Sequence, residues 1–123
     1  MATNTVKIPG PDHPITIEPS SKHVRVRAGD VVIADTTQAL TLKEANYPAV
    51  LYVPRADTKL DLLTRTARTT HCPYKGDASY YSITAGDSVL DNAIWTYETP
   101  FPAMADIKDY LAFYPDKVTI ETD

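Results

Sequence analysis

Alternation of hydrophobic and polar residues predicts short β-strands in the first half of the chain. In residues 15–18 and 23–28, apolar side chains occupy every second position, which places them on one face of an extended segment. The Gly-Asp pair at 29–30 is typical of a tight turn, so residues 31–36 should complete a β-hairpin. Residues 49–53 are continuously apolar and predict a strand that is covered on both faces.

The second half of the chain shows the same strand pattern, interrupted by two segments with helical spacing. Residues 79–84 and 88–98 flank a Gly-Asp turn and predict a second hairpin, and residues 118–121 predict a final strand. Leucines in 56–66 predict one or two helical turns, and an apolar stripe in 102–111 predicts a short amphipathic helix. Because the connections are too short for βαβ units, we expect a mainly β fold, a small antiparallel β-sheet domain with one or two short helices.

Length and composition are those of one soluble domain over residues 1–123, in which a Pro- and Gly-rich extended arm at 1–14 precedes the first strand. Hydrophobic residues make up 43% of the chain, enough for a core. No apolar run approaches the roughly 18 residues of a membrane span, and the start lacks a signal-peptide pattern, so we expect no membrane association. A single cysteine fits a reducing, cytoplasmic location. None of these features indicates an oligomeric state.

The net charge of −4 argues against nucleic-acid binding, which needs a basic surface. The charge is unevenly distributed: residues 55–75 carry five bases against two acids, whereas residues 76–123 carry nine acids against two bases. A basic segment on an acidic protein can attract a small anion. A solvated rim is the alternative, because exposed charges are common and cost little.

Candidate catalytic residues are concentrated around the only cysteine, Cys72. Cys72 can act as a nucleophile if Lys75 or Arg68 stabilises its thiolate; a buried structural cysteine is the alternative. His71 faces the other way in an extended chain and is either a general base or a structural histidine. Lys75 before a glycine can hold a phosphate, although no P-loop sequence surrounds it. One cysteine and three scattered histidines lack the ligand spacing of a zinc site, so we predict no metal and no cofactor.

Aromatic residues supply candidates for ligand binding. On the strand predicted at 88–98, Trp95 and Tyr97 share one face and can line a cavity through stacking or cation–π contacts. Tyr81 on the neighbouring strand and Tyr52 in the apolar strand are further candidates. An aromatic core is the commoner arrangement. The eight tyrosines of this small chain nevertheless favour a pocket with polar groups, because buried hydroxyls need partners.

Two charged residues directly after the apolar strand complete the ligand-binding set. Arg55, together with Lys75, can bind an anionic group. Asp57 lies four residues before Asp61, and paired carboxylates suit acid–base chemistry. Capping of a helical turn and exposure to solvent are the alternative roles for these acids.

Four segments give the chain a resemblance to a known family. They are VLYVPRADTKLDLL (50–63), THCPYKGDASYYSI (70–83), NAIWTYETP (92–100) and IKDYLAFYPDKV (107–118). With these segments in this order and spacing, the chain resembles the domain-of-unknown-function family 427 from about residue 13 to residue 121. The CPYKG and W-x-Y elements are specific in combination, whereas either one alone is not.

The resemblance implies a compact β domain of the Mss4-like or β-tent architecture. Relatives of that shape include zinc-binding proteins, methionine sulfoxide reductases and an aromatic-cage ligand domain, so a cavity lined by aromatic residues is the feature that can carry over. The zinc cysteines are absent here, and Pro73-Tyr74 after Cys72 does not match the reductase signature. The family has also carried a nucleotidyltransferase-like label. The Gly-Asp pairs of this chain do not supply the turn and spaced acids which that chemistry needs.

Three functions are compatible with these observations. The first, which we favour, is binding of a small anionic or aromatic molecule in an aromatic-lined pocket, with or without catalysis. The second is a thiol-dependent enzyme with Cys72 as its nucleophile. The third is a non-enzymatic protein-interaction module that uses exposed edge strands or the acidic C-terminal half.

Overall fold

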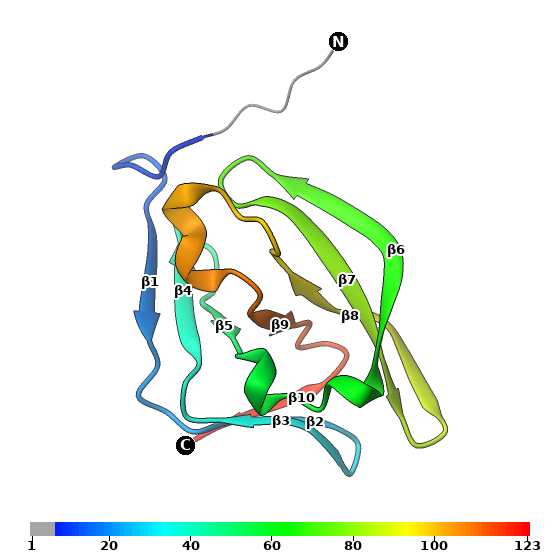
Figure 1. Cartoon of the computed structure of the whole chain (residues 1–123). Coiled ribbons are helices and arrows are strands. Elements are labelled where there is room, and N and C mark those ends of the chain that lie inside the picture. Colours follow the sequence, from blue (N-terminus) through cyan, green and yellow to red (C-terminus); the bar gives the residue numbers. More distant parts are fainter. Residues whose placement is uncertain (1–6) are drawn as a thin grey trace.

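Ten β-strands in three antiparallel sheets make up most of residues 7–123, the part of the chain that the computed structural model describes (Figure 1). The first sheet has the order β1-β4-β5 and consists of β1 (Ile15–Pro19), β4 (Leu40–Glu44) and β5 (Val50–Tyr52). The second has the order β10-β2-β3 and consists of β10 (Thr119–Thr122), β2 (Val24–Ala28) and β3 (Val31–Thr36). The third has the order β6-β7-β8-β9 and consists of β6 (Leu63–Cys72), β7 (Gly76–Ala85), β8 (Ser88–Thr96) and β9 (Leu111–Phe113). The predicted mainly β, antiparallel fold class is confirmed.

The three sheets lie around a common interior, with the first sheet on the left of Figure 1, the second below and the third on the right. Val53, directly after β5, and Leu111 in β9 exchange two backbone hydrogen bonds of 2.8 Å, which tie the first sheet to the third. Helical structure in the described residues is limited to three 3₁₀ segments: η1 (Arg55–Asp57), η2 (Leu60–Leu62) and η3 (Pro102–Ile107). None of these helices is long and apolar enough to cross a membrane.

Both predicted hairpins are confirmed. In β2, Val24, Val26 and Ala28 are buried, and β3 pairs with this strand in antiparallel register. β7 and β8 form the second hairpin. Gly29 and Gly86 have φ angles of +60° and +61°, a conformation that side chains with a Cβ rarely adopt. The two Gly-Asp pairs therefore mark the two turns, as the sequence predicted.

The prediction of helical turns over 56–66 is only partly correct. Two isolated 3₁₀ turns occur there, but from Leu63 onward the chain is the ten-residue strand β6, which the hydrophobic pattern did not predict. β6 is an edge strand, and most of its side chains are exposed, so it lacks an apolar alternation. Its backbone hydrogen bonds with β7 and its threonine-rich composition, rather than burial, hold it in the sheet.

The predicted amphipathic helix over 102–111 is wrong in its second half. η3 ends at Ile107, and its φ/ψ angles are already non-helical at Met104. Lys108 already has a non-helical ψ angle of 127°, and Asp109, with a φ angle of +66°, donates its backbone N–H to the carbonyl of Tyr97. Leu111 lies in β9 and pairs with Val53. Its backbone N–H and carbonyl both find partners in this pairing and need no helix. Met104 and Ile107 are buried, so the first part of the apolar stripe was read correctly.

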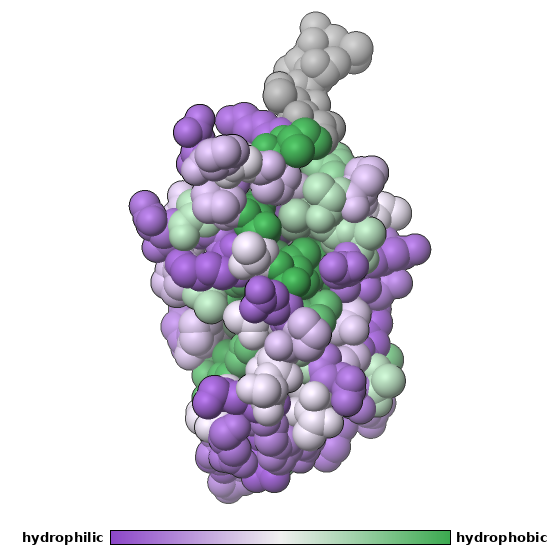
Figure 2. All heavy atoms as spheres, turned by 90° about the vertical axis from the view of Figure 1, so that its left-hand side faces the viewer, coloured by the Kyte–Doolittle hydropathy of each residue, from purple (hydrophilic) through white to green (hydrophobic). Residues whose placement is uncertain are grey.

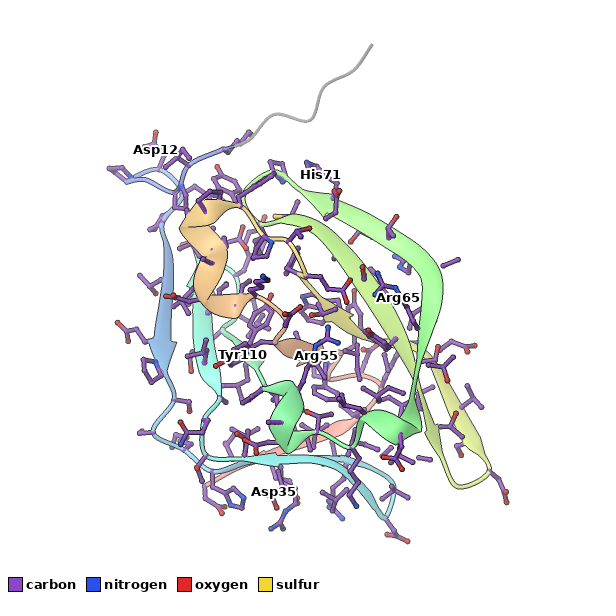
Figure 3. All side chains as sticks on the ribbon, viewed as in Figure 1. Asp12, Asp35, Arg55, Arg65, His71 and Tyr110 are labelled. Atoms are coloured by element: carbon purple, nitrogen blue, oxygen red, sulfur yellow. The ribbon has the colours of Figure 1, made fainter. Side chains whose placement is uncertain are left out.

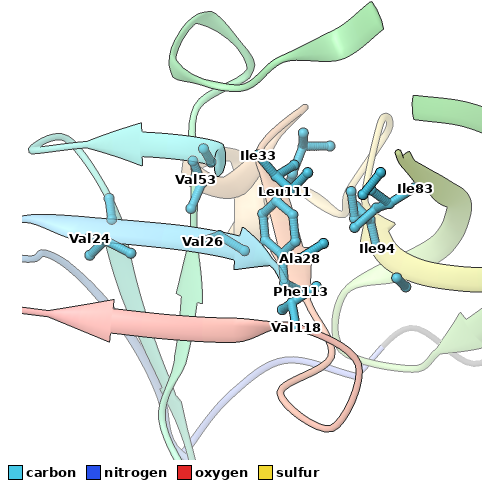
Figure 4. Packing of buried hydrophobic residues seen from close by; sticks show 14 residues of the cluster. Val24, Val26, Ala28, Ile33, Val53, Ile83, Ile94, Leu111, Phe113 and Val118 are labelled. Atoms are coloured by element: carbon cyan, nitrogen blue, oxygen red, sulfur yellow. The ribbon is translucent and has the colours of Figure 1, made fainter. Parts of the chain in front are cut away.

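Two hydrophobic clusters form the core. The aliphatic cluster lies between the second sheet and strands β7 to β9 (Figure 4), and its largest members are Val24, Val26, Ile33, Val53, Ile83, Ile94, Leu111 and Phe113. The tyrosine cluster lies between the first sheet, η3 and the other face of β7 and β8, and consists of Leu42, Tyr52, Ala78, Tyr80, Tyr97, Met104, Ile107 and Ala112. The third sheet therefore packs against a different cluster on each face.

The predicted N-terminal arm is described only in part, because residues 1–6 lie outside the described residues. The backbone N–H of Lys7 donates to the carbonyl of Pro73 at 2.8 Å, and the His13 ring stacks on Tyr74 with ring centroids 4.0 Å apart. The segment 7–13 thus lies against the turn between β6 and β7. On the β1 side of the molecule, Figure 2 shows small hydrophobic areas separated by hydrophilic side chains.

Candidate functional site

A cavity of about 240 Å³ lies beside the tyrosine cluster, between β4 and β5 on one side and β7 and β8 on the other. Six of its eleven lining residues are aromatic: Tyr47, Tyr52, Tyr80, Trp95, Tyr97 and Tyr114. Two lining residues, Glu44 and Lys75, carry charge. We call this space the aromatic cavity.

Strand alternation aims Trp95 and Tyr97 into the aromatic cavity, as the sequence predicted. Trp95 is held from two sides. Its indole N–H donates a 3.2 Å hydrogen bond to the Tyr52 hydroxyl, with the two rings nearly perpendicular at 86°. Its ring centroid lies 4.5 Å from that of Tyr114. The indole is therefore fixed in one orientation before any ligand binds.

The turn between β6 and β7 places Lys75 at the cavity wall. Gly76 has a φ angle of +110°, and a Cβ at this position would lie 3.4 Å from the carbonyl oxygen of Thr99. The carbonyl of Lys75 accepts a 3.0 Å hydrogen bond from the N–H of Phe101. The glycine of the CPYKG motif thus permits both the turn and the close approach of the segment after β8.

Lys75 forms an almost fully buried ion pair with Glu44. The Lys75 ammonium donates to one Glu44 carboxylate oxygen, and the other oxygen lies 2.7 Å from Nε2 of His13. The side chains of Lys75 and Glu44 are only 10% and 16% exposed. Burial by itself raises the pKa of Glu44, but the hydrogen bonds from Lys75 and His13 outweigh it, so the pKa lies below the ordinary value. Glu44 is therefore ionised at neutral pH, with both carboxylate oxygens occupied.

Two tyrosine hydroxyls at the cavity are held neutral. Burial is the main cause that raises the pKa of both Tyr52 and Tyr97 far above the ordinary value of tyrosine. Tyr97 is only 6% exposed, yet its hydroxyl makes no hydrogen bond to any described residue. No polar side-chain atom among the described residues is both sealed from solvent and unpartnered, so this hydroxyl is accessible to solvent, and Tyr97 lines the cavity. Its proton can therefore donate to water or to a ligand.

Tyr80 and Tyr114 form a hydrogen-bonded pair at another wall. Their hydroxyl oxygens are 3.3 Å apart, and the Tyr80 hydroxyl lies 3.0 Å from that of Thr70. Burial raises the pKa of Tyr114 to about 12, and the bond to Tyr80 adds to this effect. For Tyr80, burial is outweighed by the hydrogen bonds from Thr70, Tyr114 and Arg68, so its pKa is lowered. Three hydroxyl protons serve these two hydrogen bonds, so the group keeps one proton that can donate to a ligand.

The two residues before the turn point in different directions, as predicted. Cys72 is partly buried against the tyrosine cluster, and the Lys75 ammonium donates to its sulfur at 3.8 Å. Cys72 does not itself line the aromatic cavity. His71 lies outside the cavity, with Nδ1 2.7 Å from Asp77 and its ring against Phe101. Of the three catalytic candidates, only Lys75 is a cavity residue.

Arg55 and Tyr81 lie in a separate polar group on the opposite face of β8. The Arg55 guanidinium lies 5.6 Å from the Tyr81 ring centroid and donates to Thr96 and Glu98 at 3.3 and 3.4 Å. Arg65 also pairs with Glu98, and its hydrogen bond is the main cause that lowers the pKa of that carboxyl. In Figure 3, Arg55 and Arg65 are labelled in the middle of the view, whereas His71 lies at the top, near the end of β6. Arg55 therefore does not join Lys75 in one anion site.

Asp57 serves the fold rather than the cavity. Its carboxylate accepts a 2.7 Å hydrogen bond from the Thr36 hydroxyl, which joins η1 to the end of β3. Its predicted partner Asp61 lies in η2 and is exposed. Among residues 7–123, no three His, Cys, Asp or Glu side chains gather in a way that could hold a metal ion.

A comparison with protein-family models matches residues 16–123 to a family described as "Domain of unknown function (DUF427)". The chain belongs to this family. The family resemblance that the four motifs predicted is thus confirmed, whereas the Mss4-like or β-tent architecture stays a prediction. No curated protein matches the DUF427 chain.

Sequence reasoning missed Glu44, Tyr80 and Tyr114 as residues of the site in this DUF427 member. A usable signal existed for Glu44. Leu40, Leu42 and Glu44 alternate along β4 and so share one face, which places a carboxylate on the apolar side of a strand. Such a position calls for a buried cationic partner, which Lys75 supplies.

Proposed function

We propose that this DUF427 member binds a small organic molecule in the aromatic cavity. The observation that carries the proposal is the Tyr97 hydroxyl, which belongs to a 6% exposed residue of the cavity lining and makes no hydrogen bond to a described residue. Because this hydroxyl is not sealed from solvent, water can be its partner in the free protein. A ligand with an acceptor group can take the place of that water.

The size of the aromatic cavity supports a compact ligand. At about 240 Å³ it exceeds the volume of roughly 150 Å³ that takes up benzene in an engineered apolar cavity. It is smaller than the roughly 300 to 1,000 Å³ of typical drug-sized sites. A molecule with one ring, or a short branched chain, fits this range. Stacking on Trp95 and neighbouring tyrosines would orient it.

Trp95 provides the test, because it is the only tryptophan of the chain and lines the cavity. We expect at least one member of a panel of single-ring acids, amides and amines to change the Trp95 fluorescence in a saturable way. Val50→Phe, which fills the cavity wall, should weaken this response by about tenfold or more. Val89→Phe is the matched control, since Val89 is 60% exposed and lies outside the cavity. Equal responses from both variants would place the binding elsewhere.

The thiol-enzyme prediction has one specific observation in its favour, the 3.8 Å contact between the Lys75 ammonium and the Cys72 sulfur. A nearby cation stabilises a thiolate. The same ammonium is already paired with Glu44, however, and Cys72 lies behind the cavity wall. This function therefore ranks second.

A further inference from the structure

A second hollow lies directly beside the aromatic cavity. It has a volume of about 420 Å³, and its lining comes from residues 47–51, from Trp95, and from Phe113, Pro115 and Ile120 near the C-terminus. The lining residues, all within the described part of the chain, include no charged side chain. We call this hollow the apolar groove.

The aromatic cavity and the apolar groove share part of their walls. Tyr47, Pro48, Val50 and Trp95 line both spaces. Polarity differs sharply between the two spaces, because Glu44 and Lys75 line the aromatic cavity but not the apolar groove. A ligand that occupies both spaces must therefore have a polar end and an apolar end.

The free hydrogen-bonding capacity in the cavity consists mainly of donors. The Tyr97 hydroxyl has no partner among the described residues, and the Tyr52 hydroxyl accepts from Trp95 while its own proton has no acceptor there. Lys75 directs one proton to Glu44 and can direct a second to Cys72, which leaves a third. The polar end of the ligand must accept these hydrogen bonds.

The donors that remain available in the cavity favour an anion over a cation. Aromatic rings around a small space also suit a cation, and this is the competing interpretation. A cation needs an available negative charge, but both oxygens of Glu44 already face Lys75 and His13. The charges of Lys75 and Glu44 offset each other, so repulsion by either one does not decide the sign of the ligand. The remaining O–H and N–H donors decide it, because hydrogen bonds to an ionised acceptor are the stronger ones.

From this geometry we infer that the two spaces form one site for an apolar carboxylate, with its carboxylate near Tyr97, Tyr52 and Lys75 and its apolar tail in the groove. This inference rests on the proposed function and adds the ligand class. A five-carbon alkyl tail that enters a groove of this composition should increase affinity by at least about tenfold, even with incomplete burial.

The experiment compares three probes by Trp95 fluorescence and calorimetry: benzoate, para-pentylbenzoate and para-pentylbenzylammonium. We expect para-pentylbenzoate to bind at least about tenfold more tightly than benzoate, and the ammonium probe to bind more weakly than either acid. Tyr97→Phe should weaken both acids by about tenfold, because a hydrogen bond to a charged group is lost. Tyr110→Phe, which changes a tyrosine outside both linings, should not.

A groove variant separates the inference from the proposed function. Ala49→Glu places a charge in the groove at an exposed position, so the affinity ratio of para-pentylbenzoate to benzoate should fall toward one. Ala67→Glu is the control, because Ala67 is exposed on β6 and lines neither space. If benzoate binds and para-pentylbenzoate binds no more tightly, the role of the apolar groove is overturned, but the proposed function still stands. Tighter binding of para-pentylbenzylammonium than of para-pentylbenzoate would overturn the assignment of a carboxylate ligand. Failure of all three probes to bind would count against both the inference and the proposed function.

Discussion

The two faces of the third sheet show how one strand can serve both the fold and the site. Ile94 on β8 lies in the aliphatic cluster with no exposed surface, whereas its neighbours Trp95 and Tyr97 face the tyrosine cluster and the aromatic cavity. Flexible aliphatic side chains interdigitate closely and contain no group that needs a hydrogen bond. Aromatic rings with hydroxyls need hydrogen-bond partners. In the tyrosine cluster they lie beside a cavity, and the proton of the Tyr52 hydroxyl has no acceptor among the described residues. The second arrangement is the one that can bind a ligand.

The largest effect is expected in the aliphatic cluster. Ile94→Ala should lower the free energy of unfolding by about 3 kcal/mol, because it removes buried methyl groups and leaves a cavity. Urea unfolding at neutral pH measures this loss. A loss below that of Ile94→Val, for which about 1 kcal/mol is expected, would show that the cluster repacks around the gap.

Breaking the ion pair of the cavity should have the next largest effect. Lys75→Met leaves Glu44 buried with only His13 beside it, so we expect a loss of about 2 kcal/mol in the free energy of unfolding. Adding Glu44→Leu should recover most of this loss, because no unpaired charge then remains. A double variant that is as unstable as the single one would mean that packing, not charge, causes the loss.

The same pair predicts a pH dependence. Since the pKa of Glu44 is lowered from the model-compound value of 4.5 in the folded protein, its stabilising effect is present above that value. It is lost as the pH falls through the lower folded pKa. Unfolding measured from pH 7 downward should thus show a smaller acid-induced loss for Glu44→Gln than for the wild type. Parallel curves would contradict the lowered pKa.

The rate at which Cys72 is alkylated distinguishes a structural cysteine from a catalytic one. Because it packs against the tyrosine cluster, we expect iodoacetamide to modify native Cys72 at least about tenfold more slowly than in the unfolded chain. Mass spectrometry over time follows the reaction. Rapid, selective modification of the native protein would instead favour the thiol enzyme.

The smallest effect on stability is expected for the residue that matters most for binding. Tyr97→Phe should change the free energy of unfolding by less than about 0.5 kcal/mol, because no described residue bonds to its hydroxyl. Tyr52→Phe removes the acceptor of the Trp95 indole and should cost about 1 kcal/mol. If Tyr97→Phe proves the more costly of the two, its hydroxyl has a structural partner.

Prediction from sequence succeeded where burial imposes a period on the chain. The β2–β3 hairpin, the β7–β8 hairpin and the shared face of Trp95 and Tyr97 all follow from alternation between a buried and an exposed side. It failed for β6, whose side chains are mostly exposed, and for β9, whose three residues are all buried. In both cases pairing with a distant strand supplies the stability, and such pairing leaves little local pattern.

The candidate site divides in the same way. Four of the residues that the sequence proposed, Lys75, Tyr52, Trp95 and Tyr97, line the aromatic cavity, and their role in binding stays a prediction. The sequence also grouped Arg55 and Tyr81 with them, which the fold places on the other face of β8. The local sequence does not show on which face of the sheet a residue from another segment will lie.

The chain by itself thus determined the mainly β class, both hairpin turns and the family, since these depend on residue periodicity, glycine conformation and motif order. Only the tertiary structure decided that Glu44 meets Lys75 and that the Tyr97 hydroxyl bonds to none of residues 7–123. Glu44 and Lys75 are 31 residues apart in the chain. Contacts over such separations depend on how whole sheets pack, so they become visible only when the sheets are assembled.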